Sequence, residues 1–96
     1  MHSMKEIDTL YKLKQHLNEK FGIQKIAVFG SVARDEATQE SDIDIAILEM
    51  KEKNYFKRVE AKYFLESQLH RKVDIGYFDT MRKIIQDEIK KDFIYV

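Results

Sequence analysis

Apolar residues recur at helical spacing over the first fifth of the chain. Between Met4 and Phe21 most of them recur at steps of three or four residues, and they comprise Ile7, Leu10, Tyr11, Leu13, Leu17 and Phe21. This spacing places them along one face of an α-helix. Gly22 follows at once and can end a helix by taking the left-handed conformation. We therefore predict a helix from Met4 to Phe21.

Two short apolar runs predict the first two strands. The run KIAVF, Lys25 to Phe29, is rich in strand-forming residues and ends at Gly30, as a buried strand does. The run DIDIAIL, Asp42 to Leu48, alternates instead, so that Asp42 and Asp44 point to one face of a strand and the isoleucines to the other. The second strand is therefore expected to bury isoleucine and to present two carboxylates together.

The second half of the chain continues the alternation of helix and strand. Residues 53–71 carry apolar side chains at mostly helical spacing beside a wide charged face. The aromatic stripe of this helix is expected to lie mostly in the core, with the alternative that part of it is left for a partner. The stripe consists of Tyr55, Phe56, Tyr63 and Phe64.

A third strand and a last helix are expected to follow. KVDIGYF, Lys72 to Phe78, predicts a strand that carries Asp74 between two β-branched residues. Asp79 or Thr80 can cap a helix that runs to about Asp92. Three isoleucines of this helix are expected to face inward, namely Ile84, Ile85 and Ile89. The ending FIYV has strong strand propensity and is expected to add an edge strand.

The order of elements predicts one α/β (α+β) domain over residues 1–96. With a short helix between the first two strands, helices and strands alternate, which favours a small mixed sheet of about four strands covered by helices. Neither a repeat nor a linker divides the chain, and proline is absent. A chain of 96 residues can bury roughly 60 to 70% of the surface exposed by its unfolded form.

Composition narrows the classes of function. The 17 basic and 17 acidic residues cancel, so there is no overall positive field for a nucleic acid, and direct nucleic acid binding is not expected. No apolar run approaches the roughly 18 residues of a membrane span. Cysteine is absent, which excludes disulfides and thiolate metal sites. The opening MHSM lacks the apolar core of a signal peptide, so we predict a cytoplasmic location.

The segment GSVARDEATQESDID, from Gly30 to Asp44, carries the candidate chemistry. Gly30 lets the backbone approach a phosphate, and Ser31 offers a hydroxyl and an amide at an expected helix start. Asp42 and Asp44 can converge on divalent cations, which prefer carboxylate oxygens, and Asp74 on a neighbouring strand can add a third carboxylate. Three crowded carboxylates repel one another unless a cation is present. The spacing therefore indicates a phosphate turn beside a metal site.

Each of these residues also has a purely structural interpretation. An isolated Asp-X-Asp is usually a solvated strand edge, and Asp74 could accept turn amides. Ser31 could cap the short helix, a role compatible with phosphate binding. Arg34 could steady a phosphate or pair with Asp35, Glu36 or another surface carboxylate. Ser41 is expected to shape the turn before the second strand.

GSVARDEATQESDIDIAIL followed by KVDIGYF resembles the signature of the DNA polymerase β-type nucleotidyltransferase superfamily. The compact length, Arg34 in GSVAR and the terminal FIYV are most similar to its minimal nucleotidyltransferase (MNT) family, often the antitoxin of HEPN-MNT pairs. The resemblance implies Mg²⁺-dependent transfer of AMP from ATP, with Gly30 and Ser31 on the triphosphate. It also places Asp42, Asp44 and Asp74 in the active site as metal ligands, with Arg34 beside the nucleotide. Many members have glycine where this chain has Asp35.

The resemblance implies a hetero-oligomer with a HEPN-type helical toxin, a ribonuclease often silenced by modification of a tyrosine. An alternative is an antitoxin that acts by direct binding, with a weak or idle nucleotide site. A third hypothesis is transfer to a small molecule, although the chain has no second domain with which to build an acceptor pocket. The residues leave the choice between catalysis and contact open.

Overall fold

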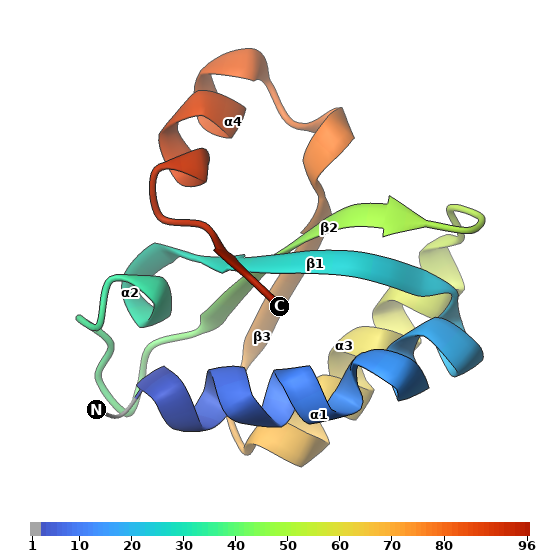
Figure 1. Cartoon of the computed structure of the whole chain (residues 1–96), viewed down its shortest axis with the longest axis horizontal. Coiled ribbons are helices and arrows are strands. Elements are labelled where there is room, and N and C mark those ends of the chain that lie inside the picture. The colour runs from blue at the N-terminus through green and yellow to red at the C-terminus, as the bar shows by residue number, and fades with distance from the viewer. Residues whose placement is uncertain (1–2) are drawn as a thin grey trace.

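The computed structural model describes residues 3–96 and contains a four-stranded mixed sheet (Figure 1). The elements are α1 (Ser3–Phe21), β1 (Ile23–Phe29), α2 (Gly30–Ala33), β2 (Ile43–Met50), α3 (Tyr55–Leu69), β3 (Val73–Tyr77), the 3₁₀ helix η1 (Phe78–Thr80), α4 (Lys83–Lys90) and β4 (Ile94–Tyr95). The strands lie in the order β3-β2-β1-β4. Of the opening segment MHSM, Met1 and His2 lie outside the described residues. The small mixed α/β sheet predicted from the pattern is confirmed.

Strand directions bring the C-terminal end of β1 and the N-terminal ends of β2 and β3 to the same edge of the sheet. β1 runs antiparallel to both β2 and β4, whereas β2 and β3 run parallel. The end of β1 therefore lies beside the beginning of β2, and the beginning of β2 beside that of β3. The predicted edge strand is confirmed, since Ile94 and Tyr95 pair with Val28 and Ala27 of β1.

One face of the sheet packs against α1 and α3 (Figure 1). The isoleucines of β2 enter this core with leucines of both helices, and the largest fully buried side chains include Leu10, Leu17, Ile43, Ile45 and Leu65. The helix predicted from Met4 to Phe21 is confirmed to within one residue, and Gly22 follows it at a φ of +72°. The apolar stripe of α1 packs on this face of the sheet, except for Tyr11, which is 66% exposed.

The aromatic stripe of α3 is mostly outside the core, contrary to the prediction. Tyr55, Phe56 and Tyr63 are 63%, 74% and 62% exposed, and only Phe64 packs against the core. The buried positions of α3 are Ala61, Leu65 and Leu69. Because these residues recur every four positions, they form the narrow face that meets the sheet, and the three exposed aromatic rings fall on other sides of the helix.

The last helix also differs from its prediction. Asp79 and Thr80 belong to η1, and α4 begins only at Lys83, with Arg82 at its N-cap and no side chain capping it. Its isoleucines do not form a buried face, since Ile84 and Ile85 are 75% and 46% exposed, Ile89 is half-buried and no residue of α4 is buried.

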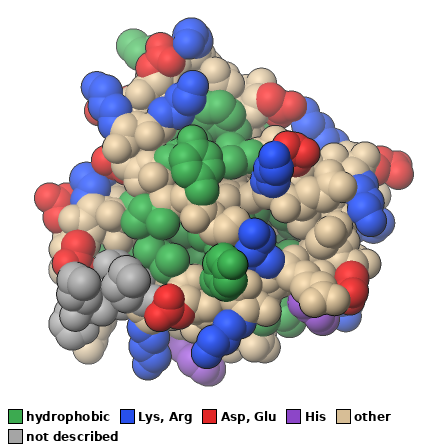
Figure 2. Space-filling view, in the orientation of Figure 1, with side chains coloured by type: hydrophobic (Ala, Val, Ile, Leu, Met, Phe, Trp, Pro, Cys, Tyr) green, Lys and Arg blue, Asp and Glu red, His purple; other side chains and the backbone are tan. Residues whose placement is uncertain are grey.

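Aromatic side chains cover part of the second face of the sheet. The ring of Phe93 packs against the rings of Phe29, Phe78 and Tyr95. Figure 2 shows hydrophobic side chains gathered in the middle of the view between α4 and α1, with charged side chains around them. Phe93 and Tyr95, which follow α4, therefore make ring contacts on this face, while the isoleucines of α4 stay exposed or half-buried. Within residues 3–96, no helix combines the length and hydropathy required to cross a bilayer.

Candidate active site

Two of the three predicted aspartates face each other on adjacent strands. Asp44 of β2 is the register partner of Asp74 of β3 in the parallel pair. Asp44 alternates with buried isoleucines, so its side chain lies on the face of the sheet opposite α1 and α3. Asp42 stands two residues earlier, just before β2 begins, and is exposed. The fold therefore gathers all three residues at one end of the β2–β3 pair.

Asp44 lies in an environment that opposes its negative charge. Burial raises the pKa of its carboxyl above the usual value, and the charges of Asp74 and then Asp42 raise it further. The guanidinium of Arg34 acts in the opposite direction and lowers the pKa of Asp44. A half-buried carboxylate with two negative neighbours is stabilised by a bound cation, so the electrostatics match a metal ligand.

Gly30 leaves the space that the Asp44 carboxylate occupies. Its φ is +77°, a left-handed conformation that favours glycine, and a Cβ built on it would collide with Oδ2 of Asp44 and lie 3.2 Å from Cγ. Sequence reasoning assigned Gly30 to the approach of a phosphate, and the structure adds a second requirement. Any larger residue at this position would displace the central carboxylate of the site.

Ser31 is the second residue of α2, which has only four residues. Phe29 occupies the N-cap, and no side chain caps the helix, so the alternative in which Ser31 is the N-cap is wrong. The first amides of a helix have no acceptor within it and can bind anionic oxygens. Ser31 directly follows Gly30, whose backbone lies against the Asp44 carboxylate, so the start of α2 is adjacent to this carboxylate.

Arg34 holds two carboxylates. Its Nε lies 2.7 Å from Glu36 Oε1, and its Nη1 lies 2.6 Å from Asp92 Oδ2, which joins α2 to the C-terminal segment. The surface pairing considered from the sequence is therefore present. Contact of Arg34 with a phosphate stays a prediction.

Asp35 is the position at which the sequence departs from the motif that it resembles. Its φ is +59°, in the left-handed region that glycine enters without strain and that aspartate tolerates better than most residues. Asp35 therefore takes this turn conformation itself, at the position where the resemblance led us to expect glycine.

The donor set fits a hard cation. Among residues 3–96, no group of three or more His, Cys, Asp or Glu side chains is close enough to hold a metal ion by itself. Mg²⁺ in nucleotide sites is usually held by one or two carboxylates together with phosphate oxygens and water. Asp42 and Asp44, with Asp74 opposite, provide carboxylate oxygens of this kind beside the Gly30–Ser31 turn.

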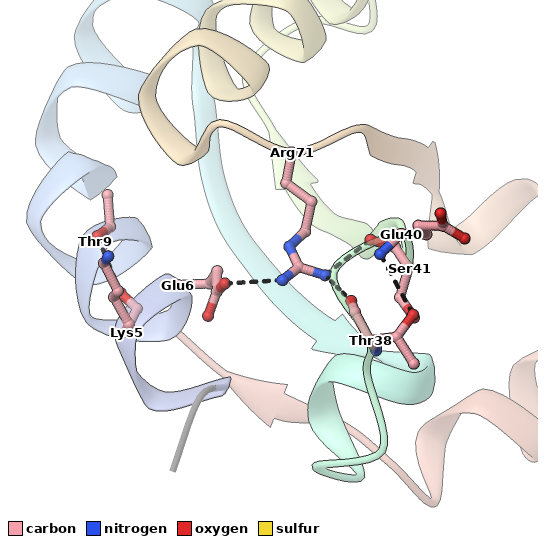
Figure 3. Close-up of polar contacts among 7 residues, drawn as sticks. All are labelled: Lys5, Glu6, Thr9, Thr38, Glu40, Ser41 and Arg71. Atoms are coloured by element: carbon pink, nitrogen blue, oxygen red, sulfur yellow. Dashed lines mark hydrogen bonds and ion pairs between the residues drawn. The ribbon is translucent and has the colours of Figure 1, made fainter.

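Arg71 is a residue of this region that sequence reasoning missed. Its Nη1 donates to the carbonyl oxygens of Thr38 at 2.6 Å and Ser41 at 2.9 Å, and its Nη2 lies 3.4 Å from Glu6 Oε1 (Figure 3). Ser41 shapes this turn as predicted, because its Oγ accepts from the amide of Thr38 at 2.9 Å. No local pattern signals the role of Arg71, since its carbonyl partners lie 33 and 30 positions away in the chain.

Known proteins resemble the chain over nearly its whole length. The sequence model of the family described as "Nucleotidyltransferase domain" matches residues 10–96. A "Putative protein adenylyltransferase" of Methanocaldococcus jannaschii is 39% identical over 98 residues, which cover 100% of both chains. "Protein adenylyltransferase MntA" of Thermococcus cleftensis is 31% identical over 97 residues, which cover 100% of this chain and 98% of the relative.

A solved structure shares both the fold and part of the sequence. The structure described as "Crystal structure of the toxin-antitoxin with AMP-PNP" aligns with a TM-score of 0.74 and 25% identity, over 92% of this chain and 69% of that one. That protein is a toxin-antitoxin assembly with a nucleotide analogue.

Proposed function

Because the chain belongs to the nucleotidyltransferase domain family, and is an enzyme of that class, we propose that it transfers AMP from ATP to a protein partner in a Mg²⁺-dependent reaction. The observation that carries the proposal is the placement of Asp44. This half-buried carboxylate lies against the Gly30 turn and opposite Asp74. This placement supports a phosphate turn and a cation site at one point of the sheet.

Each predicted residue has a role in this proposal. Gly30, Ser31 and the first amides of α2 hold the outer phosphates of ATP. Asp42, Asp44 and Asp74 hold Mg²⁺ together with phosphate oxygens of ATP, and the bound ion would supply positive charge to the attacking and leaving oxygens. Arg34 is near enough to Asp44 to affect its pKa and contributes a positive charge beside the nucleotide.

The transfer replaces one P–O bond of ATP by another. A hydroxyl oxygen of the partner attacks the innermost phosphorus of ATP and forms the new P–O bond. The bond between that phosphorus and the oxygen bridging to the next phosphate breaks, and pyrophosphate leaves. One of the three carboxylates accepts the hydroxyl proton. Negative charge develops on the phosphate oxygens, so the amides at Gly30 and Ser31 stabilise the transition state by being already oriented.

The partner we propose is a toxin of the HEPN type, bound in a hetero-oligomer in the cytoplasm. Support comes from the relatives named protein adenylyltransferases and from the related toxin-antitoxin assembly. The exposed aromatic side chains of α3 are one surface available for protein contact. A second candidate function, neutralisation of the toxin by contact alone, uses the same exposed surface and needs no metal.

The double variant Asp42→Asn, Asp44→Asn separates the two functions. Asparagine keeps the side-chain size and removes two negative charges, so metal binding is lost while the isoleucine face of β2 still packs. Wild type and variant are incubated with ATP, Mg²⁺ and the candidate toxin, and the toxin is weighed by intact mass spectrometry. We expect a mass gain of one AMP with wild type only. If neither protein changes the mass, yet both bind the toxin and block its activity equally, contact is the function.

A further inference from the structure

Arg71 joins three segments that are distant in the sequence. Its guanidinium contacts Glu6 of α1 and the turn from Thr38 to Ser41, while its own backbone lies between α3 and β3 (Figure 3). The side chains of Arg71 and Glu6 are only 16% and 14% exposed. The pair is therefore screened less than a surface ion pair, and its geometry is held by its surroundings.

Two of these three segments, the turn from Thr38 to Ser41 and the backbone of Arg71 itself, lead directly into the acidic site. Ser41, whose carbonyl accepts from the guanidinium, is followed by Asp42. Lys72 follows Arg71, and its backbone carbonyl oxygen accepts a hydrogen bond from the amide of Ile43 at 2.9 Å. Asp74 comes two residues after Lys72. Arg71 thus connects the backbone that enters β2 with the backbone that enters β3, at the level where the carboxylates meet.

The chemistry of the contact requires an arginine. The planar guanidinium carries five donors in a rigid fork, so one side chain can bond two carbonyl oxygens and still face a carboxylate. A lysine ammonium in this place carries the same charge without the fork. Glu6 Oε2 is buried without a hydrogen-bond partner in the described part of the chain, so within that part Arg71 is the charged partner of this carboxylate.

From this geometry we propose that Arg71 is a positioning residue, which sets the separation of Asp42 from Asp44 and Asp74 and thereby the affinity of the site for Mg²⁺. The proposal rests on the proposed function, because it takes these aspartates as the metal ligands. Asp42 depends on such support because it precedes β2, so the sheet ladder does not hold it. Groups that orient metal ligands typically change metal affinity by about 10- to 100-fold when removed.

The test measures the Mg²⁺ concentration that gives half-maximal binding of the non-hydrolysable analogue AMP-PNP, by calorimetry. The variants are Arg71→Met, which removes the guanidinium, and Arg71→Lys, which keeps the charge and the fold. We expect Arg71→Met to raise this concentration by about tenfold and Arg71→Lys to give an intermediate value. At saturating Mg²⁺ both variants should approach the wild-type affinity for the analogue. Amide hydrogen exchange at Ser41 and Asp42 should be faster in both.

The control variant is Lys25→Met, which removes the ion pair of Lys25 with Glu49 on the exposed surface of β1 and β2. It should leave the Mg²⁺ requirement unchanged. If Arg71→Lys, alone or with Arg71→Met, keeps the wild-type Mg²⁺ requirement, Arg71 has only a structural role and the positioning proposal is wrong. If the wild type itself binds AMP-PNP equally with and without Mg²⁺, the proposed function fails instead, so the two failures are distinguishable.

Discussion

Asp44 and Asp74 are direct register partners on parallel strands, so β2 and β3 present two carboxylates at the same level of the sheet. Ladder hydrogen bonds hold these positions, so repulsion between the charges cannot be relieved by separating the strands. The pKa of Asp44 is raised by burial and by this neighbour, together with Asp42. The folded chain thus retains an electrostatic cost that a bound cation can remove.

Replacement of Asp44 by asparagine should stabilise the metal-free protein at neutral pH. Because the pKa of Asp44 is higher in the folded than in the unfolded state, the folded protein binds this proton more tightly. The ionised carboxylate therefore lowers stability above its folded-state pKa, and this cost disappears as the pH falls below the ordinary aspartate value of about 3.9. In EDTA, we expect Asp44→Asn to raise the melting temperature by a few degrees at pH 7, with the gain shrinking in acid.

The control is Asp8→Asn on the exposed surface of α1. It should change the melting temperature little at either pH. An Asp44→Asn variant that is less stable than wild type at pH 7 would show that the carboxylate makes favourable contacts which outweigh its repulsion.

Replacement of Gly30 by alanine should destroy the site as well as lower stability. Gly22 is a matched control, because its φ of +72° is close to the +77° of Gly30, while the nearest atoms to its Cβ would be those of the Lys51 side chain, at 3.5 Å or more, which is ordinary contact. The left-handed conformation should cost each alanine variant of the order of 1–3 kcal/mol of unfolding free energy. Only Gly30→Ala also displaces the Asp44 carboxylate.

Urea unfolding and Mg²⁺-ATP calorimetry separate these effects. We expect Gly22→Ala to lose stability and keep nucleotide affinity, and Gly30→Ala to lose both. Equal nucleotide affinity in the two variants would contradict the placement of the site at Gly30.

ATP binding should depend on a divalent cation. Without it, the triphosphate meets the three carboxylates at short range, so affinity in EDTA should be at least about tenfold lower than with Mg²⁺. In EDTA, the double variant Asp42→Asn, Asp44→Asn should bind ATP more tightly than wild type does, because two charges that repel the triphosphate are gone. Calorimetry of both proteins in both buffers gives the four affinities. A wild-type affinity that is the same in EDTA would exclude the proposed site.

Arg34→Gln and Asp92→Asn should distinguish a phosphate contact from an anchor for the C-terminal segment. Both substitutions break the pair of Arg34 with Asp92, in which the arginine side chain is 45% exposed, and each should cost up to about 1 kcal/mol of stability. If Arg34 contacts phosphate, only Arg34→Gln should weaken Mg²⁺-ATP binding, by about tenfold, as expected for a charged hydrogen bond. The Asp92→Asn variant should bind nucleotide at least as tightly as wild type, because it removes a carboxylate that competes with phosphate for the Arg34 guanidinium. An equal loss of nucleotide affinity in both variants would show that Arg34 acts by holding the C-terminal segment through Asp92 and not by contacting phosphate.

The elements and the acidic site were largely predictable from local pattern. The stripe of α1, the alternation in DIDIAIL and the run KIAVF correspond to observed elements, because helix and strand periods are properties of neighbouring residues. The turn chemistry was predictable for the same reason, as shown by Gly22 in the left-handed conformation and by Ser41 within its own turn. The alternation in β2 also determined that Asp44 would point away from the isoleucine core.

The tertiary structure decided what depends on distant partners. The aromatic rings of α3 and the isoleucines of α4 have helical spacing, yet they remain exposed, because burial depends on which face another element covers. The parallel register that sets Asp44 opposite Asp74 is a choice of strand pairing, which neither strand encodes alone. Arg71 shows the same limit most clearly, since its partners on α1 and on the turn before Asp42 become neighbours only when the chain folds. Periodicity is a short-range property, whereas the assembly of this site depends on contacts between segments far apart in the chain.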